Sequence, residues 1–143
     1  MLYGAVGYKV FHSKATQAAA APEAVPVYYR SAGEAKALLT TVDPAKFTRA
    51  DKRKSYHVAK EIPGVLVQQP CYCYCQRQGH RGLLDCFRSG HAASCHICIK
   101  EALLAGKMHR EGKSLEEIRA AIIHGDSANV TASTEPTSSE ATR

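Results

Sequence analysis

The strongest constraint on this chain of 143 residues is that all six of its cysteines lie between positions 70 and 98. They are Cys71, Cys73, Cys75, Cys86, Cys95 and Cys98, and three of the seven histidines, His80, His91 and His96, lie in the same stretch. Thiols gathered this closely are reactive, and they serve metal binding, disulfide bonding or electron exchange. We find no recognisable catalytic signature outside this stretch. Any fold of the chain must therefore be organised around it.

Helix start and stop signals on both sides of the cysteines predict a mostly α-helical fold. Ser31–Glu34 is a capping box, which predicts a short helix through residue 40. Asp43-Pro44 begins a second helical pattern, which ends before Pro63 and forms one helix or two that break near residue 51. Ser114–Glu117 is another capping box, and Gly125 ends the helix that follows it. We predict a small helical domain over residues 31–125, built around a cysteine-rich loop.

The two ends of the chain lack this patterning. Residues 1–30 have many small residues and little periodicity, so we interpret them as a linker or a truncated anchor. Residues 126–143 contain almost nothing apolar and cannot offset the entropy of ordering. We therefore expect disordered N- and C-terminal segments. No apolar run reaches the roughly 20 residues that cross a bilayer, so membrane attachment would depend on an N-terminal anchor.

The net charge of +6 favours acidic partners or anionic surfaces. Most of the excess lies between Lys46 and Lys60, where it fits the solvated face of a helix. No signature of a nucleic-acid-binding module is present, so we expect no nucleic-acid partner.

Cys71, Cys73 and Cys75 alternate along the chain. In an extended segment their side chains point to the same side, and in a loop they can surround a single ion. Cysteines two residues apart are poor disulfide partners, because the bridge requires a specific separation and torsion. The run therefore favours a metal, or long-range pairing with the other three cysteines. The alternating Tyr72 and Tyr74 are expected to face away and pack on the helices.

A helix predicted over about residues 91–107 carries further candidate ligands. His91, Cys95 and Cys98 are spaced so that they share one face of this helix, about one turn apart. Cys86 lies in the linking loop and His80 lies between glycines, so both can reach the same ion. The candidate metal ligands are Cys71, Cys73, Cys75, His80, Cys86, His91, Cys95 and Cys98.

Three interpretations of the thiols stay open. Their density and spacing favour metal binding. Three disulfides are the structural alternative, because short proteins of oxidising compartments often depend on such bridges. A thiol redox role is less favoured, since Cys95-x-x-Cys98 lies inside a predicted helix rather than beside a βαβ pattern. Nothing in the sequence names a substrate, so we expect a binding protein rather than an enzyme.

The number of ligands bears on the choice of metal. Six thiols and up to three imidazoles exceed the four ligands of one tetrahedral zinc site. A surplus of soft thiolates suits copper(I), or a cluster of more than one ion. Zinc is the second choice. An iron–sulfur cluster is the third, because its familiar cysteine spacings are absent.

The cysteine order resembles that of the bacterial proteins named for a PCYCGC motif. The matching residues are Pro70–Cys75, Gly79-His80, Leu84–Phe87, His91-Ala92, Cys95, Cys98 and Glu117–Arg119, preceded by Tyr56–Pro63. The similarity spans about residues 56–123. Members are often secreted or lipoproteins, and their function is essentially uncharacterised. The resemblance therefore implies an extracytoplasmic setting, in the periplasm or cell envelope, and a metal site. Tyr74 stands where the family has glycine, which predicts strain if that position requires a positive φ.

We therefore predict an extracytoplasmic metal-binding protein that handles or stores copper(I). Besides the metal ion, we expect an envelope protein as a partner. The alternatives are a disulfide-stapled accessory subunit of an envelope complex, a structural zinc protein and a thiol oxidoreductase.

Overall fold

The computed structural model describes residues 24–132 of the chain. Every regular element within these residues is a helix, and they contain no strand. The prediction of a mostly α-helical fold is confirmed. The expectations for residues 1–23 and 133–143 lie outside the described residues.

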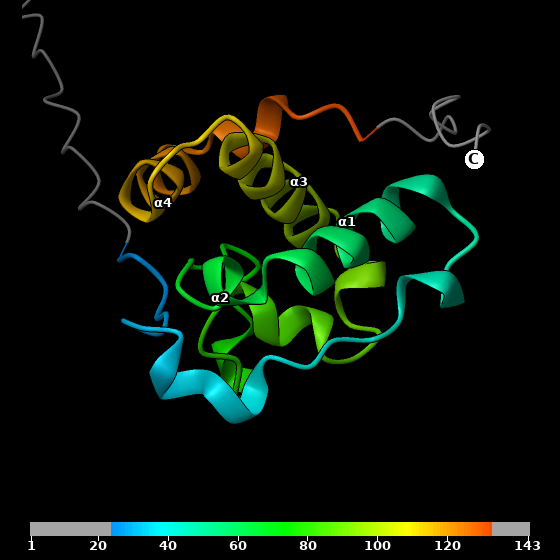
Figure 1. Cartoon of the computed structure of the whole chain (residues 1–143), viewed down its shortest axis with the longest axis horizontal. Helices are drawn as coiled ribbons and strands as arrows, with labels where there is room; N and C mark the ends of the chain where they lie inside the picture. Colours follow the sequence, from blue (N-terminus) through cyan, green and yellow to red (C-terminus); the bar gives the residue numbers. More distant parts are fainter. Residues whose placement is uncertain (1–23, 133–143) are drawn as a thin grey trace, which may run out of the picture.

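The core is built on two helices that pack against each other at the centre of the molecule (Figure 1). The α-helices are α1 (Ala50–Glu61), α2 (Pro63–Leu66), α3 (His96–Arg110) and α4 (Leu115–His124). α1 and α3 approach closely at Gly106, where a Cβ atom would lie only 2.8 Å from Val58 Cγ2. α4 packs on the other side of α3. No helix within residues 24–132 is long and apolar enough to cross a membrane.

The C-terminal helix begins and ends where the sequence predicts. The hydroxyl of Ser114 accepts the Glu117 N–H at 3.1 Å, and the Glu117 carboxylate accepts the Ser114 N–H at 2.8 Å. Gly125 follows the helix in the left-handed conformation, with φ 88°. Both features satisfy backbone groups that the helix ends leave unpaired.

The second helical pattern breaks earlier than predicted. Asp43 caps the 3₁₀ helix η2 (Pro44–Lys46) through the N–H of Ala45, but this helix ends after one turn. Phe47 is extended, and its ring packs on Tyr56 of α1 with centroids 4.1 Å apart. The break therefore lies before Ala50 rather than near residue 51, because the chain turns to bury Phe47.

The packed domain extends beyond both predicted boundaries within the described residues. Tyr29 is buried, and its N–H donates to Val67 O at 3.2 Å, so this part of the expected linker belongs to the core. At the other end, η6 (Asp126–Asn129) packs on α3. Lys100 Nζ donates to Ala128 O at 3.0 Å. The tail predicted from residue 126 is therefore ordered over its first residues.

The start of α3 corrects the predicted helix over residues 91–107. The segment before it forms a separate 3₁₀ helix, η5 (Ala92–Ser94), and Cys95 is extended with φ −123° and ψ 108°. The cause is a contact from α1: the Tyr56 hydroxyl donates to Ser89 O at 2.7 Å and accepts the Ala93 N–H at 3.2 Å. This contact holds the segment out of the path of α3.

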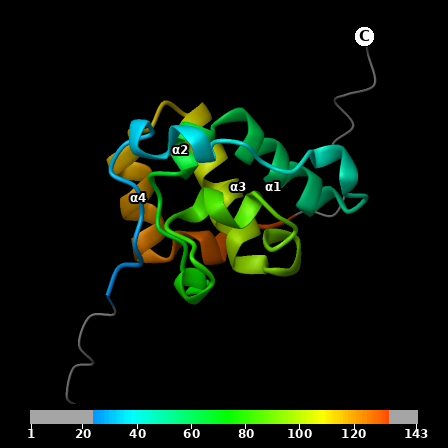
Figure 2. The ribbon, with the colours of Figure 1, turned by 90° about the horizontal axis from the view of Figure 1, so that it is seen from below.

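The cysteine-rich loop follows α2 and returns to the core at the 3₁₀ helix η4 (Leu83–Phe87), as the green ribbon in Figure 2 shows. The N–H of Leu83 donates to Gln69 O at 2.9 Å and closes the base of the loop. Gly82 allows this approach, because a Cβ there would lie 2.8 Å from Val67 O. The short 3₁₀ helix η3 (Cys75–Gln78) forms the tip.

Candidate metal centre

The structure brings five cysteine sulfurs together, and we call them the cysteine cluster. Its members are Cys71, Cys73, Cys75, Cys86 and Cys98. Its members come from the loop after α2, from η3, from η4 and from α3. The Sγ–Sγ separations are 3.3 Å for Cys71–Cys73, 2.9 Å for Cys73–Cys75, 3.5 Å for Cys71–Cys98, 3.4 Å for Cys75–Cys86 and 3.8 Å for Cys71–Cys86. Thiols distant in sequence thus converge, as the prediction of a shared site requires.

Two histidines border the cysteine cluster. His80 Nδ1 lies 3.0 Å from Cys75 Sγ and 3.4 Å from Cys86 Sγ. His91 Nε2 lies 3.9 Å from Cys73 Sγ. The two imidazole rings meet edge to face with centroids 5.0 Å apart. Both histidines are half-buried, so they lie between the sulfurs and the solvent.

The ligand atoms form three overlapping groups, within each of which all atoms lie within 4.8 Å of one another. The groups are Cys71–Cys73–Cys75–Cys86, Cys73–Cys86–His91–Cys98 and Cys75–His80–Cys86–His91. We call the first the all-sulfur group and the third the outer group. Cys86 belongs to all three. The structure thus brings seven of the eight predicted ligands together.

Cys95 belongs to none of these groups. The predicted helix face placed it between His91 and Cys98, but only Cys98 lies within α3. Cys95 is the extended residue before the helix, and it packs half-buried at the edge of the core. His91 reaches the cluster from the segment before α3, through a turn rather than along a helix face.

Tyr74 shapes the loop that carries the first three cysteines. It adopts the left-handed conformation, with φ 54° and ψ 37°, and within the described residues it is the one non-glycine residue with a positive φ. The condition under which the sequence predicts strain at this position, a positive φ, is therefore met. Tyr74 as a whole residue is 42% exposed, so the expectation that it faces away from the thiols and packs on the helices is wrong. Its ring instead contacts Tyr72 edge to face, with centroids 6.0 Å apart.

Glu101 is a site residue that the sequence did not single out. It lies one turn after Cys98 on α3 and is only 1% exposed. Its Oε1 accepts the backbone N–H of Tyr72 at 3.0 Å, whereas Oε2 has no hydrogen-bond partner. Burial raises the pKa of Glu101 to about 7. The signal available in the sequence was an acidic residue among apolar neighbours of a core helix.

Two further residues fix the histidine segments, and the sequence analysis gave neither of them a role at the site. Tyr56, through the contacts with Ser89 and Ala93, holds both ends of the turn that carries His91. Asp85 is buried, and its Oδ2 accepts the Arg81 N–H at 2.8 Å, which fixes the chain just after His80. Such supporting contacts orient metal ligands, and losing them usually weakens metal binding.

Hydrogen bonds within the cysteine cluster separate the ionisation of its thiols. The bond from Cys71 to Cys73 lowers the pKa of Cys73 and raises the pKa of Cys71. Hydrogen bonds with Cys71, Cys73 and Cys98, followed by burial, raise the pKa of Cys86. Burial, and then the nearby charge of His91, lower the pKa of His80, which favours a neutral imidazole. These shifts favour the thiolate form of Cys73 and the neutral form of His80, which are the forms that bind a cation.

The donor set fits a soft metal ion. All six cysteines are free, and the separations of 2.9 to 3.8 Å within the cluster exceed an S–S bond of about 2.05 Å. Metal–sulfur bonds of about 2.3 Å in tetrahedral geometry place two sulfurs about 3.8 Å apart. The cluster is therefore close to the dimensions that an ion requires. Its five sulfurs and two nitrogens exceed the ligands of one tetrahedral ion.

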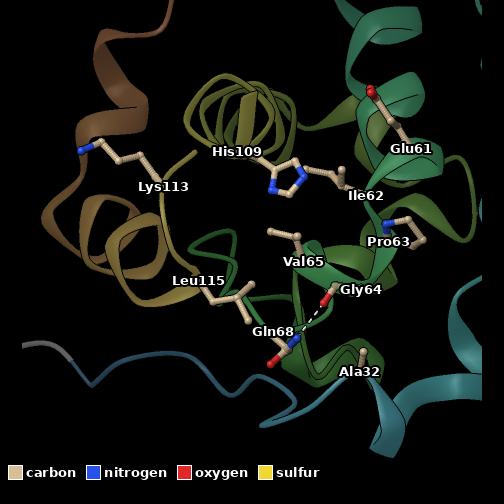
Figure 3. A pocket seen from close by; sticks show the side chains of 10 residues that line it. All are labelled: Ala32, Glu61, Ile62, Pro63, Gly64, Val65, Gln68, His109, Lys113 and Leu115. Carbon is tan, nitrogen blue, oxygen red and sulfur yellow. Dashed lines mark hydrogen bonds between the residues drawn. The ribbon is translucent and has the colours of Figure 1, made fainter. Parts of the chain in front are cut away.

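A shallow pocket lies elsewhere, between the ends of α1, α3 and α4 (Figure 3). Glu61, His109 and Lys113 are among the residues that line it, as are Gln68 and Gly64, where Gln68 Nε2 donates to Gly64 O at 2.8 Å. No group of metal-ligating atoms within the described residues includes these side chains. The cysteine cluster with its two histidines is therefore the candidate site.

Comparison with known families agrees with the cysteine order. Residues 34–139 match the family described as a protein of unknown function with PCYCGC motif. Comparison with curated proteins and with solved structures gives no significant match. Because the family match covers more than half of the chain, this chain belongs to the PCYCGC family, and the resemblance inferred from the sequence is confirmed.

Proposed function

We propose that this member of the PCYCGC family binds copper(I) in the cysteine cluster and handles or stores it outside the cytoplasm. The observation that carries the proposal is the convergence of five sulfur atoms, in which neighbouring sulfurs lie 2.9 to 3.8 Å apart. Thiolates are soft ligands, which favour copper(I) over hard cations. A buried cluster of this kind also shields the ion from water.

The overlap of the three ligand groups supports more than one ion per chain. Cys86 belongs to every group, and Cys75 belongs to both the all-sulfur group and the outer group. A thiolate sulfur has several lone pairs and can bridge two ions. Shared sulfurs would therefore hold neighbouring ions in one compact centre, which suits storage as well as transfer.

Zinc is the second candidate, and the outer group favours it. Two sulfurs and two imidazole nitrogens, from Cys75, Cys86, His80 and His91, make a donor set that structural zinc sites use. The five-sulfur cluster exceeds what such a site needs, so copper(I) remains our proposal. A disulfide-stapled accessory subunit and a thiol oxidoreductase rank below both metal-binding functions, because the six thiols are free and no substrate is indicated.

The setting and the partner are also part of the proposal. The family supports an extracytoplasmic location, since its members are often secreted or lipoproteins. In such a setting we expect an envelope protein to deliver or receive the metal. We propose a binding protein rather than an enzyme, and a turnover that one cysteine substitution abolishes would contradict this.

Elemental analysis combined with thiol counting tests the proposal. The protein is purified without oxygen, loaded with copper(I) or zinc(II), and freed of loosely bound metal. We expect more than one copper ion per chain, and thiols that react only after a copper(I) chelator is added. Retention of zinc but not of copper(I) would support a structural zinc protein. Thiols that a reductant releases and a chelator does not would identify a disulfide-stapled protein.

A further inference from the structure

We propose that His80 and His91 form the loading position of the centre, from which copper(I) passes to the buried sulfurs. This inference rests on the proposed copper(I) binding and concerns the route that the ion takes. Three observations carry it: the burial of the ligands, the sharing of sulfurs between groups, and the open surroundings of the two histidines.

The ligands of the centre differ in how far they are buried, so some of them face the protein interior and others still reach the solvent. Cys86 and Cys98 are 0% exposed, and Cys71 is 4% exposed. His80 and His91 are half-buried, as is Cys73. The ligands of the centre that an ion from solvent can meet first are therefore Cys73, which belongs to the all-sulfur group, and the two imidazoles.

The outer group and the all-sulfur group share Cys75 and Cys86. His80 Nδ1 lies 3.0 Å from the sulfur of Cys75, and His91 Nε2 lies 3.9 Å from the sulfur of Cys73. An ion in the outer group is thus already bound by two sulfurs of the all-sulfur group. It can move inward by exchanging nitrogen for sulfur without leaving the protein.

The direction of this exchange follows from the ligand chemistry. Copper(I) is a soft ion and prefers thiolate to imidazole, so the transfer from the outer group inward is favourable. Copper stays in the +1 state throughout. Each nitrogen–copper bond that breaks is replaced by a sulfur–copper bond, the proton of the incoming thiol passes to water, and the imidazole is free for another ion.

The chain keeps the approach to both histidines open. Gly79 precedes His80 and Gly90 precedes His91, and a Cβ at either glycine would meet no heavy atom within 4 Å. At the same time Tyr56 fixes the turn that carries His91. The backbone before each histidine therefore borders open space, and the half-buried imidazoles still reach the solvent, as a loading position requires.

The test is the rate of copper(I) uptake from a coloured bicinchoninate–copper(I) complex, followed by stopped-flow absorbance. The double variant His80→Gln, His91→Gln removes both imidazoles but nearly preserves side-chain size. The matched control is His57→Gln, His96→Gln, because these histidines are exposed and belong to none of the ligand groups. Far-ultraviolet circular dichroism of each metal-free variant checks that it folds, and the two single variants repeat the test if the double variant does not fold.

We expect the double variant to take up copper(I) about tenfold more slowly, or slower still. Its final thiolate-to-copper absorbance should still show an occupied all-sulfur group, with at most the outer ion lost. The control should load at the wild-type rate. Equal rates in the double variant and the control would overturn the inference while leaving copper binding intact. Loss of all bound copper from the double variant would also overturn the inference, because the histidines would then hold the metal rather than load it. A wild-type protein that binds no copper(I) would overturn the proposed function itself, and the inference with it.

Discussion

The backbone N–H of Tyr72 donates a hydrogen bond to Glu101 Oε1 across 3.0 Å, and this bond ties the cysteine-rich loop to α3. Tyr72 lies between two cysteines of the cluster, and Glu101 lies one turn beyond Cys98 on α3. The contact therefore fixes the loop sulfurs relative to the helix sulfur. It does so with a carboxyl group that is almost completely buried.

We predict that Glu101→Gln changes how stability depends on pH. Burial raises the pKa of Glu101 from 4.5 to about 7, so the folded protein retains a proton that the unfolded chain has lost. The stabilisation from this group is complete below pH 4.5 and is lost as the pH rises to about 7. The shift from 4.5 to about 7 corresponds to roughly 3 kcal/mol. Glutamine does not titrate, and its Oε1 can still accept the Tyr72 N–H.

Urea unfolding of the metal-free, reduced protein at a series of pH values measures this effect. The free energy of unfolding of the variant, relative to wild type, should increase between pH 4.5 and about 7 and then level off. Comparing the two proteins cancels the titration of the groups that do not interact with Glu101, whereas Cys71 and Cys73 do interact with it. A difference that does not vary with pH would show that Glu101 titrates as an exposed carboxylate.

Tyr74 offers a second prediction, about backbone strain. A side chain in the left-handed region costs roughly 1 kcal/mol relative to glycine. Tyr74→Gly and Tyr74→Ala both remove the ring and its contact with Tyr72, but only glycine removes the strain. We therefore expect the glycine variant to be more stable than the alanine variant by about 1 kcal/mol in chemical denaturation. In an ordinary loop conformation the order would be reversed, and that result would contradict the φ of 54°.

The close approach at the base of the loop gives a third prediction. Gly82→Ala would place a Cβ atom 2.8 Å from Val67 O, and backbone cannot move aside as a flexible side chain can. We expect a loss of about 1–3 kcal/mol in the free energy of unfolding. Gly90→Ala is the matched control, because its added Cβ would meet no heavy atom within 4 Å. It should change stability by no more than about 0.5 kcal/mol, and equal effects at the two glycines would contradict the close packing at Gly82.

The parts of the fold that the sequence predicted correctly depend on local signals. The capping box at Ser114 and the glycine at position 125 fix the ends of α4 through bonds between near neighbours. The start of α3 could not be predicted in this way. It depends on the hydroxyl of Tyr56, which reaches across the core to Ser89 and Ala93. A contact of that kind leaves no periodic pattern in the sequence.

The same distinction applies to the candidate site. The density of cysteines indicated that the loop thiols and Cys98 converge, because few arrangements use them all. The helical position predicted for Cys95 was wrong, since α3 begins only at His96 and Cys95 is the extended residue before it. The role of Glu101 was missed because its partner is the backbone of Tyr72, and a backbone donor has no signature of its own.

The last prediction compares two cysteines that the sequence treated alike. Cys86 belongs to all three ligand groups, whereas Cys95 belongs to none. If the cluster binds copper(I) as proposed, Cys86→Ala removes a ligand from every group and should lower the copper content by more than one ion per chain. Cys95→Ala should bind as much copper as wild type.

Alanine is the right substitution for this comparison, because Cys86 is 0% exposed and a serine hydroxyl there would be buried. Circular dichroism and urea unfolding of the metal-free variants establish that both fold, and elemental analysis then gives the copper content. Copper(I) should also raise the melting temperature of Cys95→Ala more than that of Cys86→Ala, because a ligand that binds the folded state more tightly stabilises it more. Equal losses of copper in the two variants would mean that the metal is held by thiols in general, rather than by the cluster that the fold assembles around Cys86.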